Sequence, residues 1–181
     1  MRQYIFGLAA LVILTGAIFG ASAFTSAEVV RDSTIGVEAD NNAIISLAPG
    51  TVGDSVTLNN NGELQINATP GSSSGVNVGA NFTYGDNASP TTSYAFSITN
   101  ADSEQRDISL AYNNVANNQG VSDAVEFEVY DSSGAHVGTV TSQNDVTNTF
   151  TSGSTYYVVM ELHTQGLDSG ADLSGDLVIT A

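Results

Sequence analysis

The feature that most constrains the fold is a series of short runs in which apolar and polar residues alternate. In residues 125–130, for example, Val125, Phe127 and Val129 are separated by single residues of a different character. An alternation with a period of two places the apolar side chains on one face of a β-strand. No stretch after the N-terminal apolar run shows a convincing helical period. The sequence therefore predicts an all-β fold.

Turn-forming residues separate the predicted strands, and Asn61-Gly62 is the strongest hairpin signal among them. The predicted strands are residues 33–38, 43–47, 55–58, 63–66, 93–99, 107–112, 124–130, 136–141, 155–163 and 175–180. Many short strands with one apolar face each indicate two packed sheets. We expect a single β-sandwich over residues 35–181, of jelly-roll or immunoglobulin-like type. Residues 72–88 hold few large apolar side chains and are predicted to form a long exposed loop.

The N-terminus has the layout of a secretory signal peptide. Arg2 precedes an apolar run over residues 4–19, and the small residues Ala21, Ser22 and Ala23 follow it. This pattern predicts a signal peptide at residues 1–23, removed by signal peptidase. The alternative is a retained membrane anchor, because the apolar stretch approaches the roughly 20 residues that span a bilayer. We favour cleavage before Phe24, which predicts a protein that is secreted and stays extracellular or at the cell surface.

The charge balance is strongly acidic. Arginine and lysine together number 3, aspartate and glutamate 19, and the formal net charge is −16. Binding to nucleic acid requires clustered basic residues, so we expect no nucleic-acid partner. A surface with many carboxylates and no lysine is similar to that of proteins from halophilic archaea, where molar salt screens the repulsion. An ordinary acidic surface protein is the alternative.

Three N-glycosylation acceptors lie close together in the sequence. They are Asn67, Asn81 and Asn87, each followed two residues later by Thr or Ser. In a secreted protein such sites mark exposed loops, so we expect a glycoprotein with glycans in this region. An asparagine-rich chain also produces such triplets by chance.

The sequence carries no recognised catalytic signature. His136 and His163 are the 2 histidines of the chain, and neither lies in a His-Glu-x-x-His motif. Neither a nucleophile elbow nor a phosphate-binding loop is present. We expect no enzymatic activity, no cofactor and no small-molecule substrate. Glu161 and His163 share one strand face and could hold a metal, but a surface pair is the favoured interpretation.

A second metal candidate is the acidic stretch near the C-terminus. Asp168, Asp172 and Asp176 recur every four residues among glycine and serine. Oxygen-rich loops of this kind can bind Ca²⁺, although the spacing differs from that of an EF-hand loop. We favour solvated acidic residues over a structural Ca²⁺ site.

Several segments together resemble a known family. After the small-residue box come Phe24-Thr25-Ser26, then the polar and acidic residues 31–40, then the apolar residues 42–49 ending in Leu-Ala-Pro. Residues 175–181 resemble a closing C-terminal strand. This layout resembles the TasA/camelysin-like secreted filament proteins and the archaeal bundling pilins, as a haloarchaeal-type member.

The resemblance implies a jelly-roll-like subunit of an extracellular filament or biofilm matrix. Its partner would be further copies of itself, joined by donor-strand complementation, in which one subunit's N-terminal segment fills a gap in the next subunit. The candidate donor strand is residues 24–34, with Phe24, Ala27, Val29 and Val30 as its apolar side chains. The alternatives are that this segment pairs within its own subunit or is a frayed leader.

Two other functional classes stay open from the sequence. One is a monomeric cell-surface module that binds glycan or another envelope protein through residues 72–88 or 142–154, where Tyr84 and Phe150 would offer apolar contact. The other is an extracellular hydrolase related to camelysin, whose activity would depend on His163.

Overall fold

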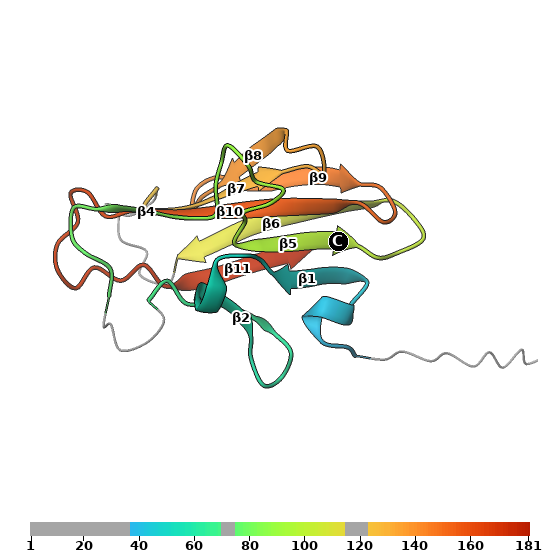
Figure 1. Cartoon of the computed structure of the whole chain (residues 1–181), viewed down its shortest axis with the longest axis horizontal. Coiled ribbons are helices and arrows are strands. Elements are labelled where there is room, and N and C mark those ends of the chain that lie inside the picture. The colour runs from blue at the N-terminus through green and yellow to red at the C-terminus, as the bar shows by residue number, and fades with distance from the viewer. Residues whose placement is uncertain (1–36, 70–74, 115–122) are drawn as a thin grey trace, which may run out of the picture. The chain divides into compact units, whose positions relative to one another are not determined.

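The computed structural model describes residues 37–69, 75–114 and 123–181 (Figure 1). The predicted signal peptide, residues 1–23, and the candidate donor strand, residues 24–34, lie outside the described residues. Phe24, Ala27, Val29 and Val30 therefore stay predictions.

The described residues form an all-β structure with two short 3-10 helices, η1 and η2. The elements are η1 (Asp40–Asn42), β1 (Ile45–Pro49), η2 (Gly53–Ser55), β2 (Val56–Leu58), β3 (Leu64–Ile66), β4 (Asn81–Tyr84), β5 (Phe96–Asn100), β6 (Arg106–Asn114), β7 (Val125–Tyr130), β8 (His136–Val140), β9 (Val146–Phe150), β10 (Thr155–His163) and β11 (Gly175–Thr180).

The larger sheet is built around β10. Its strand order is β1-β5-β10-β7-β8, all antiparallel, and β4 also pairs with β10. One edge of β10 pairs with β7. Its other edge pairs first with β5, along residues 155–158, and then with β4, along residues 160–163. Strand β10 is therefore paired along both edges.

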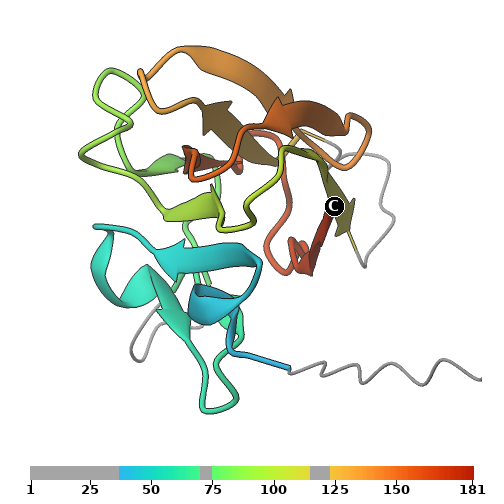
Figure 2. The same cartoon turned by 90° about the vertical axis from the view of Figure 1, so that its right-hand side faces the viewer.

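A second sheet has the order β11-β6-β9, and β2 and β3 form a separate hairpin. The turn between β8 and β9 is tight, since Thr141 and Asn144 form an isolated bridge there. This turn joins the end strand of the large sheet to an end strand of the small one. The opposite end strands of the two sheets are β1 in the large sheet and β11 in the small one, and both are visible in Figures 1 and 2.

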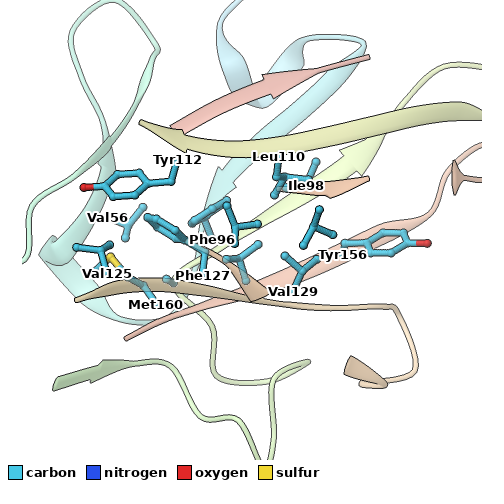
Figure 3. Close-up of a cluster of buried hydrophobic side chains, with 14 of the residues drawn as sticks. Val56, Phe96, Ile98, Leu110, Tyr112, Val125, Phe127, Val129, Tyr156 and Met160 are labelled. Atoms are coloured by element: carbon cyan, nitrogen blue, oxygen red, sulfur yellow. The ribbon is translucent and has the colours of Figure 1, made fainter. Parts of the chain in front are cut away.

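The core lies where the inner faces of the two sheets meet. From β10, the side chains of Tyr156, Val158, Met160 and Leu162 are buried, as the alternation predicts. These four side chains belong to one core cluster with Phe96 and Phe127 of the same sheet and with Leu110 and Tyr112 of β6. Figure 3 shows Met160 beside Val125 and Phe127 in this cluster. The Phe127 ring meets Phe96 and Tyr112 edge-on, with centroids 6.3 Å and 5.4 Å apart. Such edge contacts add to the stability from burial itself.

One polar side chain is fully buried between the sheets. The Asn100 amide, at the end of β5, donates to the carbonyl oxygens of Glu104 and Phe150, at 2.8 Å and 2.9 Å. Its oxygen accepts from the backbone N–H of Asp102. Because its partners satisfy it, Asn100 joins β5 to the end of β9 without the cost of an unpaired buried group.

The structure confirms the prediction of an all-β, sandwich-like chain and most of its strands. Residues 155–163 and 175–180 are strands with the predicted bounds. The Asn61-Gly62 turn does connect the two strands of a hairpin. Gly62 takes a φ of 82°, which favours glycine, and a Cβ there would come within 2.4 Å of Ala39.

Three expectations are corrected. Residues 72–88 are not simply a loop, because β4 lies within them and has Phe82 and Tyr84 packed against the core. Residues 142–154 contain β9, which is another strand that the sequence analysis missed. Val37 and Glu38 were predicted to end a strand, but they form none, and Val37 is 97% exposed.

Replacing Phe96 tests the shared core. Its ring is fully buried between the sheets, so Phe96→Ala should lower the free energy of unfolding by about 3–5 kcal/mol. Thr57→Ala, at an exposed position of β2, should change it by about 0.5 kcal/mol or less. Chemical denaturation measures both variants, and equal effects would contradict this core assignment.

Candidate functional site

A large groove lies on the side of the sandwich away from the β8–β9 turn. Its volume is about 860 Å³, and β1, β3 and β11 contribute apolar walls. Leu47 comes from β1, Leu64 and Ile66 from β3, and Leu177 and Ile179 from β11. All five side chains are only partly buried, although they pack against the core. The described residues therefore cover the core incompletely here.

Strand β11 forms one wall and has a free edge in the described structure. Among the described residues it pairs with β6 alone. Its alternation is complete, since Leu177 and Ile179 face inward while Asp176, Val178 and Thr180 are exposed. A free edge presents unpaired backbone N–H and C=O groups that another strand can join.

The start of β11 is fixed by its packing on Tyr112. A Cβ on Gly175 would come within 2.6 Å of the Tyr112 ring, so a larger residue would displace the strand. The Tyr112 hydroxyl donates to the carbonyl oxygen of Leu173 at 2.7 Å. Burial, assisted by the charges of Asp172 and Asp176, raises the pKa of Tyr112 to about 12. The hydroxyl therefore stays protonated and holds the chain that leads into β11.

The β2–β3 hairpin forms another wall, and η1 anchors it. The Asp40 carboxylate accepts a hydrogen bond of 2.7 Å from the backbone N–H of Leu64. The backbone N–H of Asp40 in turn donates to the carbonyl oxygen of Gly62 at 2.9 Å. These bonds place Leu64 and Ile66 on the groove.

The floor of the groove includes Phe127 and Met160 of the large sheet.

A second group of polar residues lies on the outer face of the large sheet. Glu126 of β7 is directly opposite Glu161 of β10. His163 lies two residues further along the same face, with its Nε2 atom 3.2 Å from Glu161 Oε2 and 3.8 Å from Glu126 Oε2. The potential metal-binding atoms of these three residues all lie within 4.8 Å of one another.

Electrostatics at this group disfavour two charged carboxylates. Burial raises the pKa of Glu126, and Glu128, Glu161 and Asp123 raise it further, while His163 acts in the opposite direction. Like charges directly opposite each other on neighbouring strands are destabilising. A proton or a cation placed between the two glutamates would relieve this repulsion.

The loop between β4 and β5 crosses the outer face beside this group. The Asn87 amide donates to a carboxylate oxygen of Glu161. Further along, Tyr94 packs on Tyr157 with ring centroids 4.8 Å apart. Val159, which precedes Glu161 by two residues on the same face, is fully buried. The loop therefore covers one part of the face.

A separate histidine–glutamate pair lies on the strand at the sheet's far edge. His136 of β8 pairs with Glu128 of β7, and the Thr139 hydroxyl donates to Glu128 at 3.0 Å. This pair contains one carboxylate and one imidazole, so it offers fewer ligands than the group around His163.

The structure places the other predicted residues as follows. Asn67, Asn81 and Asn87 are exposed, but Asn81 lies in β4 and not in a loop. Asp168, Asp172 and Asp176 are not part of the metal-compatible group found among the described residues. The Ser174 hydroxyl and backbone N–H donate to Asp172 and hold the pKa of that carboxyl below its usual range.

The two aromatic residues predicted to offer contacts from binding loops, Tyr84 and Phe150, lie in strands instead. Phe150 is fully buried in β9, where it stacks on Tyr156 with ring centroids 3.6 Å apart. Tyr84 lies in β4, and its hydroxyl donates to the carbonyl oxygen of Ala68 at 2.6 Å. Phe150 is therefore unavailable to a ligand.

Sequence reasoning paired Glu161 with His163 but missed Glu126. The signal for Glu126 is its position between Val125 and Phe127, which places it on the polar face of β7. Only the register between β7 and β10 brings it to Glu161.

No protein-family model matches the chain, and no curated protein matches its sequence. Within the described residues, no helix has the length and apolar character needed to cross a bilayer.

The raised pKa of Glu126 predicts a pH-dependent stability. The folded protein holds this proton more tightly than the unfolded chain. The stability that this proton contributes is fully present below the ordinary glutamate pKa of about 4.3. It is lost as the pH rises through the raised pKa of Glu126. With a chelator present, Glu126→Gln should therefore add about 0.2–1 kcal/mol to the free energy of unfolding at pH 8 and nothing at pH 4.

The control is Glu104→Gln, which makes the same change in net charge at an exposed position. Denaturant titrations at the two pH values compare these variants. If Glu126→Gln does not raise the free energy of unfolding at pH 8, or raises it more at pH 4, the electrostatic explanation is wrong.

Proposed function

We propose that this protein is a secreted structural subunit of an extracellular filament or cell-surface matrix. Its subunits would be β-sandwiches of jelly-roll or immunoglobulin-like type, joined by donor-strand complementation. The observation that carries the proposal is the groove beside β11, where, among the residues that the structure describes, a free strand edge borders incompletely covered apolar side chains.

The groove offers both elements that strand addition requires. Backbone groups along the free edge of β11 supply hydrogen bonds, and alternate side chains of the incoming strand fill pockets that set the register. Leu177 and Ile179 are spaced two residues apart and face the groove. An added strand would cover them together with Leu47 and Ile66, which burial of apolar area favours.

The proposed donor is the segment that begins at Phe24. Its apolar residues Phe24, Ala27, Val29 and Val30 supply side chains of the kind that the groove accepts. A contact between the N-terminus of one copy and the β11 edge of another is heterologous and need not close, so it generates filaments. If the same segment instead pairs with its own β11, the product is a monomer.

Deletion of the donor tests the first half of the proposal. A secreted variant without residues 24–31 should fold but form no filaments, because its groove has nothing to receive. Electron microscopy in high salt and N-terminal sequencing of the wild-type sample make the comparison. Filaments from the deleted variant, or a wild-type protein that stays monomeric at all concentrations, would contradict it.

A matched pair of substitutions on β11 tests the groove. Leu177→Asp places a charge at an inward position, whereas Val178→Asp places it on the next residue, which is 41% exposed. We expect Leu177→Asp to abolish assembly and Val178→Asp to preserve it, because only the first buries a charge under the added strand. Sedimentation measures assembly, and circular dichroism checks folding.

Mixing separates loss of assembly from loss of folding. The deleted variant keeps an intact groove, and Leu177→Asp keeps an intact donor. Together they should form one-to-one dimers that do not grow, although neither assembles alone. Absence of such dimers between two folded variants would contradict exchange between copies.

A further inference from the structure

We propose that Glu126, Glu161 and His163 form a binding site for a divalent transition-metal cation of the Zn²⁺ class. The site lies on the outer face of the large sheet. It is separate from the groove because Met160 and Leu162, which alternate with Glu161 and His163 along β10, face the opposite side. Binding there is independent of the proposed filament assembly.

Strand pairing positions the backbone of all three proposed ligand residues without a bound ion. Glu126 and Glu161 are register partners on adjacent strands, and His163 follows on the strand that is paired along both edges. Sites on paired strands hold their ligands more firmly than sites on loops. Asn87 adds support from outside, since its amide donates to Glu161. Such outer contacts orient metal-binding carboxylates.

The distances between the ligand atoms suit a small cation. Zn²⁺ lies about 2.0–2.2 Å from imidazole nitrogen and carboxylate oxygen, so tetrahedral ligands are about 3.3 Å apart. His163 Nε2 lies 3.2 Å from Glu161 Oε2 and 3.8 Å from Glu126 Oε2. All three ligand atoms lie within 4.8 Å of one another, so one ion between them requires the carboxylates to move closer together and leaves a fourth position for water.

The chemistry of the group favours a transition metal over Ca²⁺ or Mg²⁺. Imidazole suits zinc, copper, iron and nickel, whereas calcium takes six to eight oxygen ligands. The local charge also calls for a cation, because two opposed carboxylates face each other and Glu128 and Asp123 add to the negative potential at Glu126. In the described part of the chain, the sole arginine or lysine is Arg106, which pairs with Asp102.

The alternative arrangement of these three side chains is an ion-pair group that binds no metal. His163 Nε2 lies within ion-pair distance of both carboxylates, and a metal ion binds only to deprotonated ligands. Experiments distinguish the metal site from the ion-pair group, because only the metal site binds metal in a fixed ratio and through the imidazole nitrogen of His163.

The test is calorimetric titration of the purified, chelator-treated protein with Zn²⁺ in molar salt, which suppresses diffuse binding to the acidic surface. We expect one Zn²⁺ per chain at this site. His163→Gln and Glu161→Gln should each weaken binding at least tenfold. His136→Gln, which removes the other histidine–glutamate pair, should leave the affinity within about twofold of wild type.

Two further readouts keep the result interpretable. The visible spectrum of the Co²⁺-loaded protein should indicate four-coordination with a nitrogen ligand in the wild type and lose that signature in His163→Gln. Circular dichroism verifies that the variants fold. Absence of one-to-one binding, equal affinity of His163→Gln and wild type, or displacement of Zn²⁺ by an equal concentration of Ca²⁺ would overturn the proposal.

Discussion

The alternation of side chains along β10 determines both the core between the sheets and the polar group on the outer face. Its inward residues, from Tyr156 to Leu162, fill the core, while Glu161 and His163 stay on the outer face. Because β7 occupies one edge and β5 and β4 share the other, β10 fixes the register of three neighbours at once. A shift of one residue would exchange the two faces, burying the charged pair and exposing the core.

Over residues 37–69, 75–114 and 123–181, the two sheets are joined on one side and incompletely closed on the other. The β8–β9 turn, which the Thr141–Asn144 bridge closes, connects an end strand of one sheet to an end strand of the other, and Asn100 ties β5 to the end of β9. On the side of β1 and β11, the hairpin β2–β3 and the start of β11 border a groove lined by partly buried apolar residues. This asymmetry is the physical basis of the proposed assembly, since added apolar cover would stabilise both the subunit and the contact.

The sequence predicted those parts of the fold that depend on local pattern. The period-two run in β7, the bounds of β10 and β11 and the Asn61-Gly62 turn were predicted because neighbouring residues specify them. The pattern of Leu177, Val178 and Ile179 indicated a central or fully covered strand, which is wrong, because β11 is the end strand of its sheet and alternates completely. Strand β4 was missed because four residues among glycine, serine and asparagine carry a weak pattern, and its partner β10 is far away in sequence. The opposition of Glu126 and Glu161 could not be predicted, since it depends on the register between two strands. The donor segment stays a prediction.

Because the sequence contains no cysteine, disulfide cross-linking between introduced cysteines can test strand exchange between copies. One chain carries Val29→Cys and a second, of different mass, carries Ile179→Cys, and the two are mixed under oxidising conditions. Disulfides form only when the Cα atoms approach to about 4.4–6.8 Å. The account predicts a disulfide between the two different chains, found by mass spectrometry. A doubly substituted chain that cross-links only within itself, with no product from the mixture, would contradict it.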